Sequence, residues 1–275
     1  MTGQLSDTGT RPVIGLLTDF GLIDPYGAEM KAVISSVCPQ ARVIDISHLV
    51  EKFNIKMGAF LLASSTAAFP DGSVFVAVVD PGVGGERRPI VIETSRSYYV
   101  GPDNGILVPA AQWEGIRCVF KITERSLMRP DISATFHGRD IFAPVAAHIA
   151  CGVSPQNCGP RITDYVNPSY SQAKVDNAGA TCEVFHVDRF GNVITNLRNA
   201  QFSALKLTQK QRIRLTLGKN RMLARYVRTY SDLKAKSELG LLEGSHGFVE
   251  IAFRESDAAK RIRVKTGMPV RISGA

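Results

Sequence analysis

The stretch SVFVAVVDPGVGGERR, residues 73–88, holds the strongest indication of the fold. It begins with an almost continuous apolar run, which is typical of a strand that helices cover on both faces of a parallel sheet. The run ends in Asp80, and a glycine-rich loop then leads to Arg87 and Arg88. A carboxylate removed from water needs a partner, and either guanidinium could fold back to Asp80. Such an ion pair could also serve only to stabilise the loop.

Short apolar runs alternate with helix-like patterns around this stretch, from Val13 to about Ile162. The alternation predicts βαβ units, and therefore an N-terminal α/β domain over residues 13–165 with a largely parallel central sheet. The run RVIDIS, residues 42–47, is expected to be a second central strand. Ligands of such sheets bind beyond the carboxyl ends of the strands. Three predicted strands end there in polar residues, which are Asp19, Asp45 with His48, and Asp80.

The composition changes at residues 166–181, which are rich in Asn, Ser, Ala and Gly and show no periodicity, so we expect a linker there. Residues 182–275 contain short alternating or β-branched runs separated by glycine-bearing turns. They predict a small barrel or sandwich of antiparallel strands, of which we favour a C-terminal β-barrel domain. The polar residues 1–12 are expected to form a flexible N-terminal lead.

The composition is that of a folded globular protein, with 44% hydrophobic and 21% charged residues. The net charge of +8 favours anionic partners, but no run of Lys and Arg is long enough for a nucleic-acid patch, so we expect no nucleic-acid partner. The five cysteines include no C-x-x-C pair, so neither a zinc site nor a disulfide framework is expected. The sequence shows no signal-peptide pattern and no membrane-spanning stretch. We therefore expect a cytoplasmic protein with no membrane partner.

The stretch TFHGRDIFAP contains a histidine just before an apolar helix. His137 is available there for proton transfer near neutral pH, although a lone histidine is more often structural. Asp140 suits the first turn of the helix, where negative charge meets the positive end of the helix dipole.

The stretch TDFGLIDPYG places two aspartates around a glycine turn, and Tyr26 begins a helix after it. Asp24 before Pro25 is a good N-cap, which explains it without a functional role. Asp19 has no such capping role.

Two further stretches resemble turns. HVDRFGNVITN places Asp188, Phe190 and Asn192 at a hairpin-like turn, which could be only a turn. GPDNGIL, residues 101–107, is ordinary turn chemistry, and we expect no site there.

Taken in order, TDFG with a following D-x-Y, VVDPGVG with two arginines, GPDNG, TFHGRDIFAP and DRFGN resemble the S-adenosylmethionine hydrolases. These enzymes are also called S-adenosylmethionine hydroxide adenosyltransferases and are akin to the fluorinases and chlorinases. The resemblance runs from about Val13 to Ala259. It implies that water attacks the ribose C5′ of S-adenosyl-L-methionine and expels methionine, which gives adenosine and L-methionine without a cofactor. It also implies a homotrimer with active sites between subunits.

The resemblance implies roles for particular residues. Asp80, Arg87 and His137 would hold and activate the water, and Asp19 would bind the ribose diol. The other implied substrate-binding residues are Asp24 and Asp188 near the methionine amino group, Asn192 and Phe190 at adenine, Tyr26 of the D-x-Y pattern, Phe53 where the halogenases have tryptophan, and Ser245 at the methionine end.

Several positions depart from the pattern of these relatives. The halogenases carry tyrosine where this chain has Asp80, and a carboxylate would repel a halide, so hydrolysis is favoured over halogenation. His246 stands where the halogenases have arginine. Lys52 replaces a common proline, and Glu255 replaces a small residue near the adenine.

Two alternatives of other classes remain open. Carboxylates and histidines on the rim, with Arg87 and Arg139 as phosphate ligands, could serve a metal-dependent phosphoesterase. No H-x-H motif or paired carboxylate marks such a cluster, so we expect no metal site. The chain could also bind S-adenosylmethionine or adenosine as a sensor, without turnover.

Overall fold

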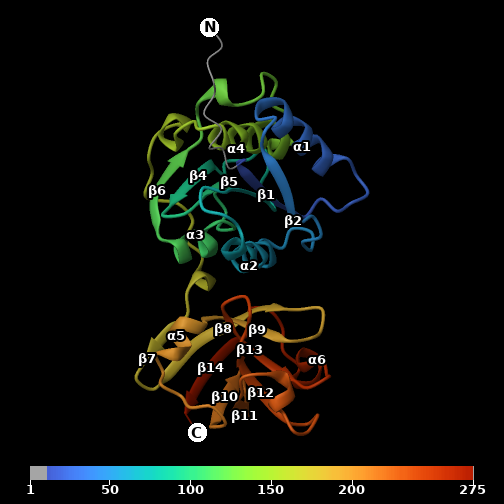
Figure 1. Cartoon of the computed structure of the whole chain (residues 1–275), viewed down its shortest axis with the longest axis vertical. Coiled ribbons are helices and arrows are strands. Elements are labelled where there is room, and N and C mark those ends of the chain that lie inside the picture. The colour runs from blue at the N-terminus through green and yellow to red at the C-terminus, as the bar shows by residue number, and fades with distance from the viewer. Residues whose placement is uncertain (1–10, 275) are drawn as a thin grey trace. The chain divides into compact units, whose positions relative to one another are not determined.

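The computed structural model describes residues 11–274 (Figure 1). The expected N-terminal lead therefore lies almost wholly outside the described residues. The chain divides into two compact units between Asn167 and Pro168, called unit 1 and unit 2 below. No helix within residues 11–274 has the length and hydropathy needed to cross a membrane.

Unit 1 is built around a six-stranded sheet. Its strands are β1 Val13–Thr18, β2 Arg42–Ser47, β3 Val74–Val78, β4 Pro89–Thr94, β5 Tyr98–Pro102 and β6 Ile116–Lys121. They lie in the order β2-β1-β3-β5-β4-β6. The first four in this order are parallel, and β4 is antiparallel to both of its neighbours. The expected α/β fold with a largely parallel sheet is confirmed.

The central position of β3 follows from its sequence. All five of its residues are buried, and Val76 pairs with Leu16 of β1 on one side and Val100 of β5 on the other. The expectation of a second central strand at residues 42–47 is wrong, because β2 pairs only with β1 and forms the sheet edge. An apolar run does not distinguish an edge from a centre, whereas charged residues such as Asp45 are typical of edge strands.

Four helices cover the sheet. They are α1 Tyr26–Val37, α2 Ile55–Ser65, α3 Val108–Glu114 and α4 Ala143–Ala150. Helices α1 and α4 pack together on one face, and α2 and α3 pack together on the other (Figure 1). A π-helical turn, Gly138–Phe142, leads directly into α4.

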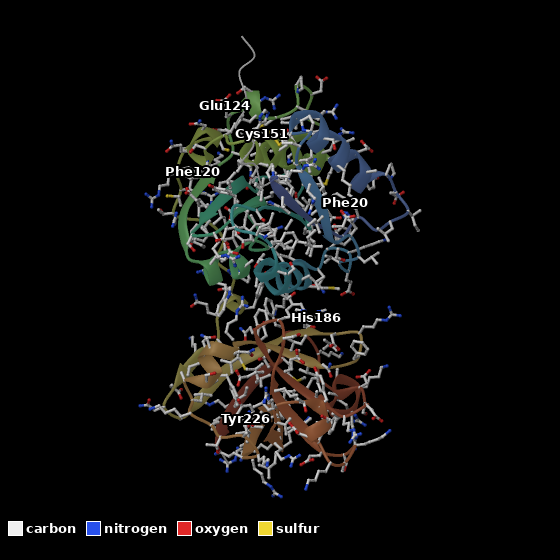
Figure 2. All side chains as sticks on the ribbon, in the orientation of Figure 1. Phe20, Phe120, Glu124, Cys151, His186 and Tyr226 are labelled. Carbon is white, nitrogen blue, oxygen red and sulfur yellow. A yellow bond between two sulfur atoms is a disulfide. The ribbon has the colours of Figure 1, made fainter. Side chains whose placement is uncertain are left out.

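A disulfide joins the ends of α1 and α4, between Cys38 and Cys151, whose Cα atoms are 6.0 Å apart (Cys151 is labelled in Figure 2). This corrects the expectation from the cysteine count. The two residues are separated by 113 positions in sequence, so no short spacing could indicate the pair. Only the packing of the two helices brings them together.

Unit 2 is a barrel. Its strands are β7 Lys174–Asp176, β8 Gly179–Val187, β9 Val193–Arg198, β10 Arg212–Leu217, β11 Asn220–Tyr226, β12 Leu239–Glu243, β13 Phe248–Phe253 and β14 Pro269–Gly274. Pairing of β14 with β8 closes seven of them, and β7 pairs with β8. Two short helices complete the unit, α5 Asn199–Ser203 and α6 Ala258–Ile262. Apolar side chains including Phe202, Leu215 and Ile251 fill its core.

Two details of unit 2 differ from the expectation. Strands β11 and β12 are parallel over their short pairing, whereas the other pairs are antiparallel. The segment 166–181, expected as a linker, contains β7 and the beginning of β8. Its small and polar residues occupy a short edge strand and a turn, which have the same composition as a linker.

Candidate active site

The loop after β3 brings a carboxylate and a guanidinium together at the carboxyl end of the sheet. Arg87 Nη2 donates to Asp80 Oδ2 at 2.5 Å, and Arg87 Nε lies 3.0 Å from both carboxylate oxygens. The two side chains are only 5% and 10% exposed. A fork of this kind is the strong form of an ion pair, because two donors face two acceptors in one plane. Of the two arginines that the sequence offered, Arg87 is therefore the partner of Asp80.

His137 completes this group. It precedes the π-helical turn, and its Nδ1 lies 2.7 Å from Arg87 Nη2. Because a guanidinium can only donate, Nδ1 must be the acceptor, and the remaining proton of a neutral imidazole is then on Nε2. Burial, and then the charge of Arg87, lower the pKa of His137. Geometry and electrostatics thus favour the same neutral form.

Arg88, the other candidate, has a supporting role that the sequence did not reveal. Its Nη2 donates to Asp103 at 2.6 Å, and its Nη1 donates to Asp164 at 2.8 Å. Asn104, the residue after Asp103, donates from Nδ2 to the backbone oxygen of Val79, which directly precedes Asp80. The GPDNG turn, for which we expected no role, therefore fixes the loop that carries the ion pair.

The loop with Asp80 and Arg87 touches the loop that leads to His137. A Cβ atom added to Gly84 would lie 2.3 Å from the backbone oxygen of Ala134, and the Gly84 φ is +76°. Only glycine combines this close approach with a left-handed conformation. Gly84 is therefore the contact that keeps the two loops in register.

Asp140 holds the other side of the His137 loop. Its carboxylate is fully buried and accepts from the backbone N–H of Ser133 and from Arg139 Nε, at 2.9 and 2.7 Å. Burial raises the pKa of Asp140, but hydrogen bonds from Arg139 and Ser133 outweigh this and lower it. Arg139 continues to Glu29 of α1 at 2.8 Å. The π-helical turn is thus tied to α1 and to the preceding loop.

Asp80 and His137 border a hollow of about 430 Å³, a volume that suits a small-molecule ligand. Its lining side chains come from the segments after β1, β2 and β3, from the beginning of α1 and from the loop before the π-helical turn. They include Asp19, Asp24, Tyr26, Lys52, Phe53, Asp80, Phe136 and His137. The structure therefore brings together six of the predicted site residues, and Arg87 contacts two of them, Asp80 and His137.

Asp19 lies at one side of this hollow, one residue beyond β1. Its Oδ2 accepts from the backbone N–H of Phe53 at 2.9 Å. Phe53 has a φ of +65°, which is rare for a bulky side chain, and its ring is 69% exposed. Strained residues of this kind cluster at ligand sites. Asp19 holds the backbone, and the ring of Phe53 remains available.

Asp24 does not cap α1. Pro25 occupies the N-cap position, and no side chain donates to or accepts from the cap. The capping explanation for Asp24 is therefore wrong, and its exposed carboxylate borders the hollow. Tyr26 packs edge-on against Phe20 and Phe136, which joins the beginning of α1 to the His137 loop (Phe20 is labelled in Figure 2).

The predicted site residues of unit 2 lie in two turns. Asp188 Oδ1 accepts from the backbone N–H groups of Phe190 and Asn192, and its Oδ2 accepts from Asn192 Nδ2 at 3.0 Å. The carboxylate therefore organises the β8–β9 turn. The ring of Phe190 is 80% exposed at its tip.

Ser245 and His246 form the exposed turn between β12 and β13. Below this turn is a buried carboxylate that the sequence did not indicate. Tyr230 donates its hydroxyl to Glu250 Oε2 at 2.6 Å, and burial raises the pKa of Glu250. In sequence Glu250 is one polar residue in a strand of buried apolar ones, which could have served as the signal.

Residues 11–274 contain no group of three or more His, Cys, Asp or Glu side chains placed to hold a metal ion. Chemically, the group in unit 1 offers a carboxylate acceptor, a fixed guanidinium and an imidazole N–H on one side of a hollow. This combination can hold and orient a small polar molecule such as water.

Comparisons with known proteins agree over nearly the whole chain. Residues 14–159 match a family model described as the SAM hydroxide adenosyltransferase N-terminal domain, and residues 182–271 match its C-terminal domain. The chain is 37% identical to the (R)-S-adenosyl-L-methionine hydrolase of Thermus thermophilus, over 95% of this chain and 99% of the relative.

Two further relatives differ in their sequence identity to this chain. A crystal structure of a conserved protein from Thermotoga maritima, 38% identical, superposes with a TM-score of 0.86 over 94% of this chain and 99% of that chain. A fluorinase from Nocardia brasiliensis is 24% identical over 96% of this chain and 97% of the relative.

We predict that Gly84→Ala destabilises the protein by about 1–3 kcal/mol, because the added methyl group meets the Ala134 carbonyl in a left-handed backbone conformation. Gly72→Ala is a matched control, since Gly72 has a φ of +82° but nothing within 4 Å of an added Cβ. Urea unfolding measures both variants. Equal losses in the two variants would mean that the contact between the loops contributes nothing.

Proposed function

Because the chain belongs to the S-adenosylmethionine hydroxide adenosyltransferase family, we propose that it is an enzyme that hydrolyses S-adenosyl-L-methionine to adenosine and L-methionine. The observation that carries the proposal is the direct contact of Asp80, Arg87 and His137 beside one hollow.

The reaction is a displacement at the ribose C5′. A water oxygen forms a bond to C5′ while the bond from C5′ to sulfur breaks, and its electron pair neutralises the sulfonium. Methionine leaves as a neutral thioether, and the attacking water loses one proton. Because the leaving group needs no activation, we propose that no metal or cofactor takes part.

The task of the protein is then to deliver the water. The Nε2–H of neutral His137 donates to the water oxygen, and the Asp80 carboxylate accepts one of the water protons. Arg87 holds both side chains in place, since its guanidinium contacts each of them. In-line positioning contributes about 7–11 kcal/mol in favourable model reactions, so a fixed water accounts for a large part of the rate.

The rest of the hollow supports substrate binding. Asp19 binds the ribose diol, because a carboxylate accepts two hydroxyl protons. Phe53 and Tyr26 offer apolar walls, and Asp24 faces the methionine amino group. In unit 2, Phe190 presents an exposed ring for stacking on adenine. Asn192, Asp188 and Ser245 complete the set, at adenine and at the methionine end.

A halogenase activity is the second candidate, since a fluorinase is a distant relative. Asp80 disfavours it. A negative side chain that is only 5% exposed would repel a halide at the point where the nucleophile must sit. The same carboxylate favours water, which can donate a proton to it.

We further propose a homotrimer with active sites between subunits and a cytoplasmic location. The assembly is implied by the family resemblance and is supported by the distribution of the proposed site residues over two units. The location is supported by the charged substrate, which does not cross a bilayer unaided. In that compartment the cysteines Cys38 and Cys151 would be reduced for much of the time.

Asp80→Asn should reduce adenosine formation by about 10²–10³-fold, because the amide keeps the shape but loses the charge that accepts the water proton. Incubation with S-adenosylmethionine and chromatography of adenosine and methionine measure this. Asp71→Asn is the control, since Asp71 also pairs with an arginine but has a 77% exposed side chain outside the hollow. Tight substrate binding by the wild-type chain with no adenosine formed would instead support the sensor.

We predict that kcat/KM falls on acidification, with a midpoint below the ordinary histidine pKa of about 6.5. Protonation of His137 at Nδ1 breaks its hydrogen bond with Arg87. The folded protein therefore resists this protonation. Its stability also falls as the pH drops from the ordinary histidine pKa to the lowered pKa of His137. His137→Asn keeps an acceptor near Nδ1 that does not titrate. A pH–rate profile of both proteins tests the assignment, and persistence of the same inflection in the variant would refute it.

The proposed assembly should have a mass three times 29.9 kDa by light scattering.

Sites shared between subunits also predict complementation. Subunits with Asp80→Asn and subunits with Asp188→Asn are unfolded and refolded together in equal amounts. Half of the copies of unit 1 and half of the copies of unit 2 are then unmutated. A site that combines units from two subunits is intact in about a quarter of cases, so the mixture should regain about a quarter of wild-type activity. A mixture no more active than its components would place each site within a single chain.

A further inference from the structure

A second polar cluster lies in unit 1, beside Asp19 in sequence and outside the lining of the hollow. Its centre is His48, which follows β2 and is only 5% exposed. His48 Nδ1 lies 2.7 Å from the hydroxyl oxygen of Thr18, the last residue of β1, which is fully buried. A buried pair of this kind is fixed, because separating it would leave two polar groups without water.

The other ring nitrogen of His48 faces charge. Nε2 lies 3.1 Å from Asp45 Oδ1 in a bent contact, and Lys31 of α1 donates to Asp45 Oδ2 at 2.6 Å. Burial raises the pKa of Asp45, but the contacts with Lys31 and His48 outweigh this and lower it. The carboxylate is therefore ionised and can only accept, so Nε2 carries a proton.

The direction of each hydrogen bond then follows. In the neutral form of the ring, a proton on Nε2 leaves Nδ1 as an acceptor, to which the Thr18 hydroxyl donates. The Thr18 oxygen is left to accept, and the backbone N–H of Phe20 donates to it at 3.3 Å. Hydrogen bonds thus connect the Phe20 backbone to Thr18 and Thr18 to His48, and an ion contact connects His48 to Asp45.

The backbone on both sides of Asp19 is tied to the same residues. The N–H of Gly21 donates to the His48 carbonyl at 2.7 Å, and the N–H of Val50 donates to the Thr18 carbonyl at 3.3 Å. The His48 ring also packs against Gly27 of α1, where an added Cβ would lie 3.4 Å from it. The cluster therefore links β1, β2 and α1 at the point where Asp19 leaves the sheet.

We propose that Thr18 and His48 are positioning residues, which fix the backbone around Asp19 so that its carboxylate meets the ribose diol of the substrate. This rests on the proposed function, in which Asp19 binds the ribose. Neither residue lines the hollow, so both act through Asp19 and not on the substrate. Their effect is on binding of the ribose, which is held equally before and during the reaction.

Thr18→Val and Thr18→Ser separate the hydroxyl from the shape of the side chain. Valine keeps the volume and removes the hydroxyl, so KM for S-adenosylmethionine should rise about tenfold while kcat changes little. Serine keeps the hydroxyl and should restore a KM near that of the wild type. A serine variant as impaired as the valine variant would overturn the proposal.

A substrate without the ribose 2′-hydroxyl gives the sharper readout. Because the proposed effect passes through the contact of Asp19 with the diol, the wild type and Thr18→Val should differ much less on this substrate. In an Asp19→Asn background, Thr18→Val should likewise add little, since coupled residues are non-additive. A tenfold effect on both substrates would show that Thr18 supports the fold in general and would refute the positioning role.

Thr94→Val is the matched control. Thr94 is a buried threonine in β4 that lies outside the hollow, and its hydroxyl oxygen is within hydrogen-bonding distance of the Ser97 carbonyl oxygen and of Glu114 Oε2. Loss of the Thr94 hydroxyl should lower stability without raising KM, and a comparable rise in KM would count against the specific role of Thr18.

His48→Asn, in which Oδ1 can still accept from Thr18, provides a second test if Thr18→Val does not fold. It should raise KM less than His48→Leu, and equal effects would refute the proposal.

Failure of the proposed function can be distinguished from failure of this inference. If the wild-type chain forms no adenosine, the hydrolase proposal fails. Calorimetric binding of adenosine and of 2′-deoxyadenosine still tests the positioning role, because Thr18→Val should weaken only the former. Equal weakening of both ligands would overturn it.

Discussion

The structure of the candidate site depends on one ion pair at the end of the central strand. Asp80 is held there because β3 is buried along its whole length and ends at the rim of the sheet. A carboxylate in that position is costly unless it is paired, and loss of a partner from a buried pair costs about 3–5 kcal/mol. Arg87 meets this need, and its Nη2 also donates to His137. One electrostatic requirement thus sets the geometry of three side chains.

Contacts with other parts of unit 1 keep these three side chains in place. The glycine-rich loop allows the backbone at Gly84 to approach the His137 loop, and Asp103 and Asn104 hold the loop from the side of β5. Asp140 anchors the π-helical turn that His137 precedes. Apart from the approach at Gly84, these supports are partly buried polar contacts, and such contacts have defined directions that apolar packing lacks. The group is therefore pre-organised, which is what orientation of a weak nucleophile requires.

A second rigid cluster serves the opposite side of the hollow. Thr18, His48 and Asp45 order the backbone at the end of β1, whereas the Asp80 group orders the loop after β3. Because β1 and β3 are adjacent parallel strands, their carboxyl ends share one rim, and Asp19 and Asp80 at these two ends border the same hollow. The residues proposed to activate water and the residue proposed to bind the ribose are thus held by different strands at one edge of the sheet. The arrangement explains why polar residues follow several strands of unit 1.

The sequence by itself determined the class of fold, and it predicted a division into two domains and a site at one rim of the sheet. Hydrophobic periodicity is local, and the rule that parallel strands end on one rim converts three separate strand ends into one predicted site. The tertiary structure alone decided which arginine pairs with Asp80, that Asp24 caps nothing, that β2 is an edge strand and that Cys38 meets Cys151. It also revealed Asp103, His48 and Glu250 as buried partners. These features depend on contacts between residues distant in sequence, or on directions of side chains, and neither a spacing nor a composition encodes them.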